Sequence, residues 1–166
     1  MIIKENKMKP QIFNELVQKI ILVTVFMLSN LQGMKAQNLE KMENKNDILM
    51  IRTALENNYF KGLYEGNIDL LATIFHHDTL LFGDIKGVPY AKTLDQYLDG
   101  VKNRQNPKDS GRPFKGEILS LHIINSIAVA EVKVTMYDFI YHDILSFHKI
   151  NDKWLIVNKM LTDTNQ

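Results

Sequence analysis

The last third of the chain alternates between apolar and polar residues, and this alternation constrains the fold more than any other feature. In the best example, apolar side chains occupy every second position, while Glu131, Lys133 and Thr135 alternate with them; the apolar set is Ala128, Ala130, Val132, Val134 and Met136. The segments with strand character are 117–124, 127–137, 139–150 and 154–161. A period of two residues, broken by short polar turns, predicts an antiparallel meander with one buried face.

The residues before the meander have helical spacing instead. Apolar side chains recur every three or four residues at Ile48, Ile51, Leu55, Tyr59 and Leu63. This stripe predicts a helix that begins with Asp47 as N-cap, runs to about Glu65 and ends at Gly66.

Two further helices are expected, at Ile68–Phe75 after an Asn67 cap and from the Thr93–Gln96 capping box to about Asn103. A strand is expected at Thr79–Gly83, and segments 84–91 and 106–113 are expected to be loops. The predicted class is α+β, with three N-terminal helices packed on one face of a curved antiparallel β-sheet.

The first 36 residues have the pattern of a secretory signal peptide. Lys4, Lys7, Lys9 and Lys19 precede the apolar run Ile20–Leu28, and a small residue, Ala36, marks the expected cleavage site. The apolar run is shorter than the roughly 20 residues that span a bilayer as a helix. We therefore expect a signal peptide at 1–36, a flexible lead-in at 37–46 and one domain at 47–166, secreted or periplasmic, with no stable membrane span after cleavage; a retained N-terminal anchor is the alternative.

Charge and cysteine content exclude several function classes. Residues 37–166 contain 15 Lys and Arg and 17 Asp and Glu, so their net charge is 15 − 17 = −2. A weakly acidic domain without a basic stripe is not expected to bind nucleic acid. The chain has no Cys, which excludes disulfides, thiol catalysis and thiolate metal sites.

Several short segments resemble the nuclear-transport-factor-2-like (NTF2-like) superfamily, in its SnoaL-like and putative lumazine-binding-like branch. The matching segments are Tyr64–Asn67, Phe75–Asp78, Leu81–Gly83, Tyr97-Leu98 and above all Asp143–Met160. The resemblance covers about residues 47–161. It implies a cone-shaped fold with a pocket between the sheet and the helices, and often a homodimer. It specifies the fold well and the activity poorly, because this superfamily hosts many functions.

The pocket that the resemblance implies would be concave and mostly apolar, with a few polar groups. The side chains expected to line it are Tyr59, Phe75, His76, Asp78, Phe82, Met136, Tyr141, Asp143 and Asn158. On the 139–150 strand, Tyr141, Asp143, Leu145 and Phe147 share one face, and Ile144, Ser146 and His148 share the other. Periodicity leaves open which face lines the pocket.

Tyr59 with Asp143 is the candidate catalytic pair. Ketosteroid isomerase, which shares the cone fold, uses an Asp base with a Tyr donor. The alternative is that Asp143 forms a strand-edge contact and that Tyr59 belongs to the core. No residue has an orienting partner visible in the sequence, so we lean toward a domain without strong catalysis.

The histidines do not predict a metal site. His76 and His77 are adjacent, and neighbouring side chains on an extended segment point to opposite sides. His142 and His148 share a face, but about six residues, or roughly 20 Å, separate them. We therefore expect no metal and no cofactor.

These observations leave three function classes open. The first is a domain that binds a small apolar molecule. The second is an isomerase- or dehydratase-type enzyme that uses the Tyr and Asp pair. The third is a protein-docking module that uses the outer face of the sheet.

Overall fold

The structure is a computed structural model that describes residues 42–164. The predicted signal peptide and residues 37–41 of the predicted lead-in lie outside this range. Within residues 42–164, no helix combines the length and the hydropathy needed to cross a membrane.

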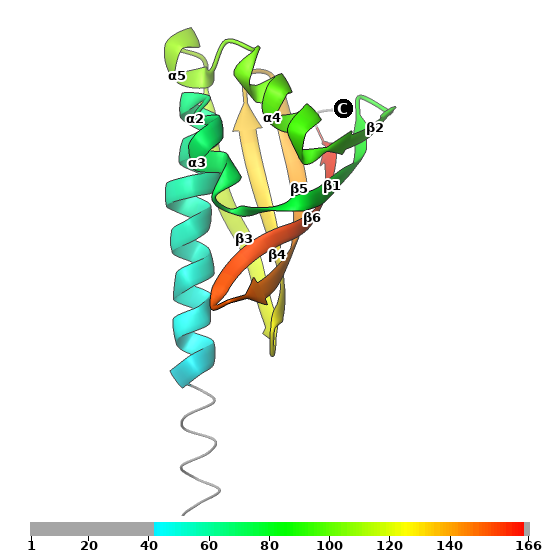
Figure 1. Ribbon diagram of the computed structural model, residues 1–166. Coiled ribbons are helices and arrows are strands. Elements are labelled where there is room, and N and C mark those ends of the chain that lie inside the picture. The colour runs from blue at the N-terminus through cyan, green and yellow to red at the C-terminus, as the bar shows by residue number, and fades with distance from the viewer. Residues whose placement is uncertain (1–41, 165–166) are drawn as a thin grey trace, which may run out of the picture. The chain divides into compact units, whose positions relative to one another are not determined.

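Six strands form a single curved sheet with the order β2-β1-β6-β5-β4-β3 (Figure 1). Their bounds are β1 Phe75–Ile85, β2 Val88–Thr93, β3 Phe114–Ile124, β4 Ile127–Met136, β5 Phe139–Ile150 and β6 Lys153–Asp163. The predicted meander from β3 to β6 is confirmed, with antiparallel pairing at each step. β6 also pairs with β1, and this contact is parallel, so the last strand lies in the interior of the sheet.

The prediction of a loop over residues 84–91 is wrong. β1 extends to Ile85, and β2 returns antiparallel to it from Val88. Lys86 and Gly87 form the connection, with φ angles of 53° and 73°. Two successive positive φ angles are typical of the tight turns that suit the twist of a hairpin, so this segment adds an edge strand to the sheet.

The helices pack against one face of this sheet (Figure 1). A long helix covers residues 42–54 and continues through the π-helical turn η1 (Leu55–Phe60) into α2 (Lys61–Glu65). The others are α3 (Ile68–Ala72), α4 (Leu94–Lys102) and the short α5 (Pro107–Ser110), which lies within the segment expected to be a loop. The predicted α+β class is thus confirmed.

Three of the predicted helix-end signals are confirmed, although α3 ends at Ala72 and not at Phe75. Gly66 ends α2 with a φ of 65°. The Asn67 side chain accepts a hydrogen bond from the Leu70 amide at the start of α3. At the start of α4, Thr93 and Gln96 form both bonds of the capping box.

Asp47 does not cap the long helix, which already includes residues 42–46. Its buried carboxylate instead makes tertiary contacts with the last hairpin. Trp154 Nε1 donates to Asp47 Oδ1 at 2.9 Å, and Lys149 Nζ lies 3.0 Å from the same oxygen. The Asp47 carboxylate therefore fastens the long helix to the β5–β6 hairpin.

Replacing Trp154 by phenylalanine should lower the free energy of unfolding by about 1–3 kcal/mol. The phenyl ring keeps most of the buried area, but it leaves a buried carboxylate oxygen without its indole donor. Urea unfolding of Trp154→Phe, Asp47→Leu and the double variant would measure the coupling. Additive effects of the two substitutions would contradict this role of the indole.

The π turn presses two adjacent aromatic residues onto the sheet. In an α-helix, Tyr59 and Phe60 would point about 100° apart, yet both are buried here. The Phe60 ring covers Gly116 of β3, where a Cβ atom would lie 2.4 Å from a ring carbon. The predicted stripe of Ile51, Leu55, Tyr59 and Leu63 is buried as well. The turn thus fixes the position of Tyr59 beneath the sheet.

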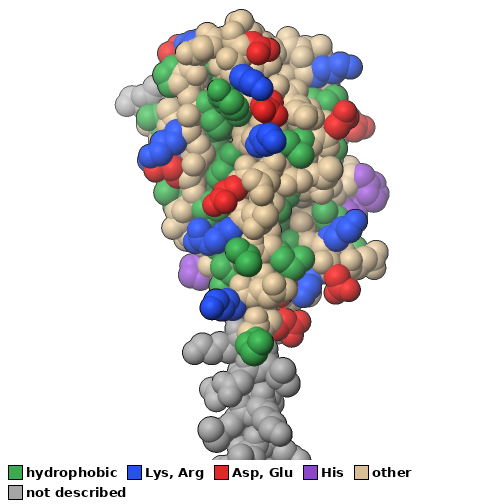
Figure 2. Space-filling model, turned by 90° about the vertical axis from the view of Figure 1, so that its left-hand side faces the viewer, with side chains coloured by type: hydrophobic (Ala, Val, Ile, Leu, Met, Phe, Trp, Pro, Cys, Tyr) green, Lys and Arg blue, Asp and Glu red, His purple; other side chains and the backbone are tan. Residues whose placement is uncertain are grey.

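The face that carries the long helix has no region of a single charge sign. Lys and Arg side chains are interspersed with Asp and Glu across it, with small apolar clusters between them (Figure 2). Such a mixed surface lacks the basic stripe that nucleic-acid binding requires.

Candidate functional site

Three polar side chains are buried together between the π turn and the sheet. Tyr59, Asp143 and Lys159 are 0%, 1% and 4% exposed. The Tyr59 hydroxyl donates to Asp143 Oδ2 at 2.7 Å, and Lys159 Nζ donates to the same oxygen at 2.8 Å. Lys159 Nζ also donates to the Tyr59 hydroxyl at 2.5 Å. An ion pair and a phenol are therefore hydrogen-bonded to one another inside the core, through Oδ2 of Asp143.

A β-bulge in β6 turns Lys159 into the interior. Trp154 and Ile156 point inward, and simple alternation would place Asn158 inward next. However, Ser146 pairs with Asn158 while the adjacent Phe147 pairs with Ile156, so Val157 is an extra residue on β6. This bulge reverses the alternation. As a result Lys159 faces the core, while the Asn158 side chain donates to the Leu80 carbonyl oxygen within the sheet.

The burial of alternate side chains shows which face of β5 points inward. Asp143, Leu145 and Phe147 are buried. Ile144 and His148, on the opposite face, are exposed. The face with Asp143 is therefore the one that faces the helices.

A cavity of about 60 Å³ lies over this polar group. Its walls come from α2, α4, the residue two positions beyond α4 and five strands of the sheet, β1, β2, β4, β5 and β6. The apolar lining residues are Leu63, Ile85, Val134, Met136 and Leu161; the tyrosines are Tyr90, Tyr97 and Tyr141; and the charged residues are Arg104, Asp143 and Lys159.

A second cavity of about 150 Å³ adjoins the first. Both are lined by Ile85, Tyr90, Tyr97 and Arg104. The second is also lined by Lys92 of β2 and by Gly100 and Val101 of α4. Cavities of roughly this size bind benzene in other proteins. The two cavities thus form one aromatic-walled site with room for a small ring system.

Tyr59, Tyr90 and Tyr141 are neutral at physiological pH, because burial raises the pKa of each. Partial burial raises the pKa of Tyr90 and that of Tyr141 to about 12. Complete burial, followed by the negative charge of Asp143, raises the pKa of Tyr59 well above its usual 10. These phenols therefore act as hydrogen-bond donors and do not add negative charge.

Raised tyrosine pKa values predict a loss of stability in alkali. In the unfolded chain these phenols ionise near pH 10, and in the folded domain near pH 12, so folding disfavours their ionised forms. Their contribution is complete below pH 10 and should be lost as the pH rises from 10 to 12. The free energy of unfolding should therefore fall less steeply with pH over this range in the double variant Tyr90→Phe/Tyr141→Phe than in the unmodified domain. An identical pH profile would contradict the prediction.

Three buried polar atoms around the cavities have no hydrogen-bond partner among residues 42–164. They are Asp143 Oδ1 and two guanidinium nitrogens, Arg104 Nε and Nη2. Buried polar groups are nearly always paired, so such atoms require an explanation, for which a bound group is one candidate.

The residues predicted to line a pocket are distributed differently. Met136, Tyr141 and Asp143 line the first cavity, and Tyr59 contacts two of its charged lining residues, Asp143 and Lys159. Phe75 is buried in the core but is not a wall of either cavity. Four others lie away from the cavities: His76, Asp78, Phe82 and Asn158. Of these, Phe82 is on the outer face of the sheet because Leu81 takes the inward position in β1.

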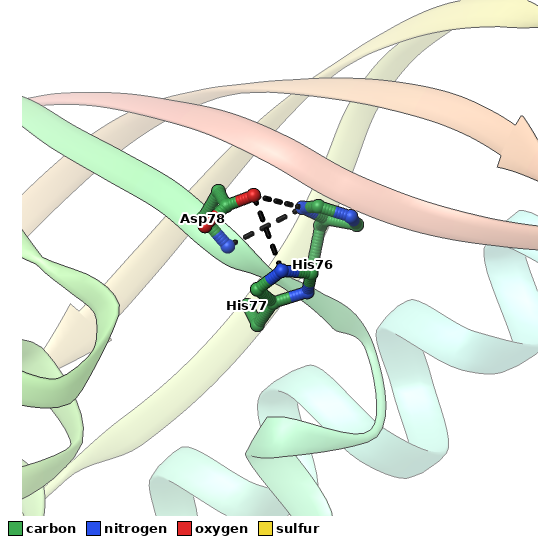
Figure 3. Close-up of side chains that lie close together, drawn as sticks. All are labelled: His76, His77 and Asp78. Atoms are coloured by element: carbon green, nitrogen blue, oxygen red, sulfur yellow. Dashed lines mark hydrogen bonds and ion pairs between the residues drawn. The ribbon is translucent and has the colours of Figure 1, made fainter.

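His76 and His77 do not point to opposite sides, and the prediction that they would is wrong. Their rings lie with centroids 4.2 Å apart, and both approach Asp78 Oδ2, from His77 Nε2 at 3.2 Å and from His76 Nδ1 at 3.9 Å (Figure 3). Strand alternation fails here because the β1–β6 register is interrupted between Phe75 and Leu80. The three groups have metal-ligand chemistry. However, His77 and Asp78 are 81% and 77% exposed, and the Asp78 amide donates a hydrogen bond to His76 Nδ1, so the cluster is a set of surface side chains that pack and bond with one another.

Sequence reasoning missed the cations of the site. Arg104 lies just beyond α4, and Lys92 lies between the segment expected to be a loop, 84–91, and the capping box that begins at Thr93. Lys159 is hidden by the bulge, which no Gly or Pro marks in the sequence. The signal available for Arg104 was its place just after the helix that begins at the Thr93–Gln96 capping box. This signal is weak, because many helices are followed by a basic residue that lines no site.

Comparison with known proteins identifies the family. The family described as putative lumazine-binding matches residues 46–162. No curated protein matches the chain significantly.

Similar solved structures share the fold. An NTF2-like protein of unknown function from Silicibacter pomeroyi has a TM-score of 0.65 at 18% identity, covering 72% of this chain and 98% of its own. One from Shewanella baltica has a TM-score of 0.64 at 19% identity, covering 73% and 96%. One from Methylobacillus flagellatus has a TM-score of 0.63 at 22% identity, covering 71% and 92%. At these identities the likeness concerns the fold alone. By the family match and by its fold, the chain belongs to the putative lumazine-binding family of the NTF2-like superfamily.

Proposed function

We propose that this domain binds a small, ring-containing molecule in the cavities between α4 and the sheet and does not turn it over strongly. The observation that carries the proposal is the site itself, with apolar and tyrosine walls over a fixed polar floor. Such concave, mostly apolar sites with a few oriented polar groups are typical of ligand binding.

Lumazine is the first probe, because the family description names it. It is a two-ring heterocycle with N–H donors, and Asp143 Oδ1 is an acceptor at the cavity without a partner among the described residues. Ligand binding to the folded state should raise the melting temperature with ligand concentration. Lumazine and one-ring analogues should give such a shift.

Filling the second cavity, of about 150 Å³, is the sharpest test of where the ligand binds. Gly100 lines that cavity on α4, and a Cβ there would meet only Lys92 Nζ, at 3.6 Å. Gly100→Leu should therefore fold, since leucine also favours helix, while it abolishes the ligand-dependent shift. Lys102→Leu, on the same helix but outside both cavities, should retain it. A shift that survives Gly100→Leu, or no shift with any probe, would overturn the proposal.

An enzyme that uses Tyr59 with Asp143 is the second candidate. The 2.7 Å hydrogen bond between them favours it. Against it, Asp143 Oδ2 already accepts from two donors, Tyr59 and Lys159. Turnover of ketosteroid, dehydratase or esterase substrates that is lost in Asp143→Asn or Tyr59→Phe, with folding intact, would promote this reading.

We also propose a homodimer through the outer face of the sheet. Phe82, Met160 and Ile144 are paired neighbours on three adjacent strands, and they are 45%, 55% and 39% exposed. A contiguous exposed apolar row often marks an interface. Light scattering should give a dimer, Met160→Glu should dissociate it, and Leu49→Glu on the long helix should not. A monomer at all concentrations would instead favour docking of another protein on this face.

A secreted or periplasmic location is proposed from the pattern of residues 1–36. Mass spectrometry of the protein from its native host should find cleavage after Ala36. A mature chain that retains Ile20–Leu28 would indicate an anchor.

A further inference from the structure

We infer that the ligand of this site carries a carboxylate, and that the Arg104 guanidinium binds it. This inference rests on the proposed binding function and specifies the chemical class of the ligand. It begins from the Arg104 nitrogens that have no hydrogen-bond partner among the described residues, Nε and Nη2.

Nε and Nη2 lie along one edge of the guanidinium plane. Their two N–H bonds point in parallel, so they can donate to both oxygens of one carboxylate. Leaving two charged donors buried without partners is costly, so their natural complement is an anion. Water can accept hydrogen bonds from such donors but leaves the guanidinium charge unneutralised, whereas a carboxylate accepts from both donors and neutralises the charge.

The charges around the site favour an anion as well. The two cavities are lined by three cations, Lys92, Arg104 and Lys159, and by one acid, Asp143. Lys159 and Asp143 pair with each other at 2.8 Å. Lys92 Nζ lies 5.1 Å from the centre of the Tyr90 ring, above its face. Around the Arg104 edge, the remaining lining groups are therefore cationic or neutral.

The walls add the second requirement, a ring next to the anionic group. Arg104, Tyr90 and Tyr97 line both cavities, so a group bound to the guanidinium also lies beside two phenol rings. Offset or edge contacts with aromatic rings stabilise a planar ligand. Small aromatic carboxylates combine both features.

Benzoate and benzamide provide a matched test, because they share size and shape and differ in charge. Titration calorimetry on the domain should give benzoate binding about tenfold tighter than benzamide or more, as expected for charge-assisted hydrogen bonds. The preference should shrink at high salt.

Three variants assign the preference to Arg104. Arg104→Met should bind both compounds equally while its melting temperature does not fall, since it removes two unpartnered donors. Arg104→Lys should retain part of the preference, because it keeps the charge and loses the fork. Arg52→Met, the same change at an exposed position of the long helix, should behave as the unmodified domain.

The outcomes separate this inference from the proposed function. Equal binding of benzoate and benzamide by the unmodified domain would overturn the carboxylate and leave the binding function standing. A preference that persists in Arg104→Met would also overturn it. Binding of neither compound, with no shift from lumazine, would sink the binding function itself.

Discussion

Replacing Lys159 by methionine should lower the free energy of unfolding by about 3–5 kcal/mol. The ammonium is buried and donates to Asp143 Oδ2 and to the Tyr59 hydroxyl. Methionine fills a similar volume but leaves the Asp143 carboxylate buried without its counter-charge. The shift of the urea midpoint at constant slope would measure the loss.

The matched control replaces the whole group. In Tyr59→Phe/Asp143→Leu/Lys159→Met both charges of this group are removed, and apolar replacements of buried ion pairs are often neutral or stabilising. The triple variant should therefore be more stable than Lys159→Met alone. If Lys159→Met left the midpoint unchanged, the ammonium would not be held by Asp143.

Replacing Gly83 by alanine should have an effect at least as large, about 4–5 kcal/mol or a failure to fold. Gly83 lies in β1 with a φ of 151° and pairs with Leu161 of β6. A Cβ there would lie 1.7 Å from the Leu161 carbonyl oxygen. Because the obstacle is backbone, the β1–β6 pair would have to separate. Soluble yield and urea unfolding would report the result.

Gly87 provides the control for backbone conformation alone. It has a positive φ of 73°, but nothing lies within 4 Å of a Cβ at that position. Gly87→Ala should lose only the cost of a left-handed residue, about 1–2 kcal/mol. Equal effects of the two substitutions would show that conformational strain, rather than the contact with Leu161, explains the requirement at Gly83.

The fold was predictable because its signals are local. The alternation in 127–137, the stripe through Tyr59 and the capping box at Thr93 each depend on neighbouring residues, and the structure bears out all three. Tyr59 and Asp143 were a candidate pair only through the resemblance to the cone fold, because the period of the 139–150 strand left open which of its faces points inward. The structure joins them by a 2.7 Å hydrogen bond.

The charged part of the site was not predictable, because it depends on departures from regular structure. The bulge at Val157 exchanges the facing of Asn158 and Lys159. The irregular stretch after Phe75 brings His76 and His77 to one side. Arg104 reaches the cavities from a bend rather than from a helix or strand. None of these departures carries a distinctive residue pattern.

The interior position of β6 in the sheet has a consequence for the folding pathway. β1 and β2 are made early in the chain, yet their connection to the rest of the sheet runs through β6, the last strand in sequence. Joining β1 to β6 closes a loop from Ile85 to Lys153, and such distant pairings slow folding because chain entropy is lost before the contact forms. The β3–β6 meander, with its short turns, is the natural nucleus. We therefore expect the edge of β6 to stay unpaired while the meander is formed and β1 has not yet paired with it. This edge is then the place at which a newly made chain is most exposed to aggregation.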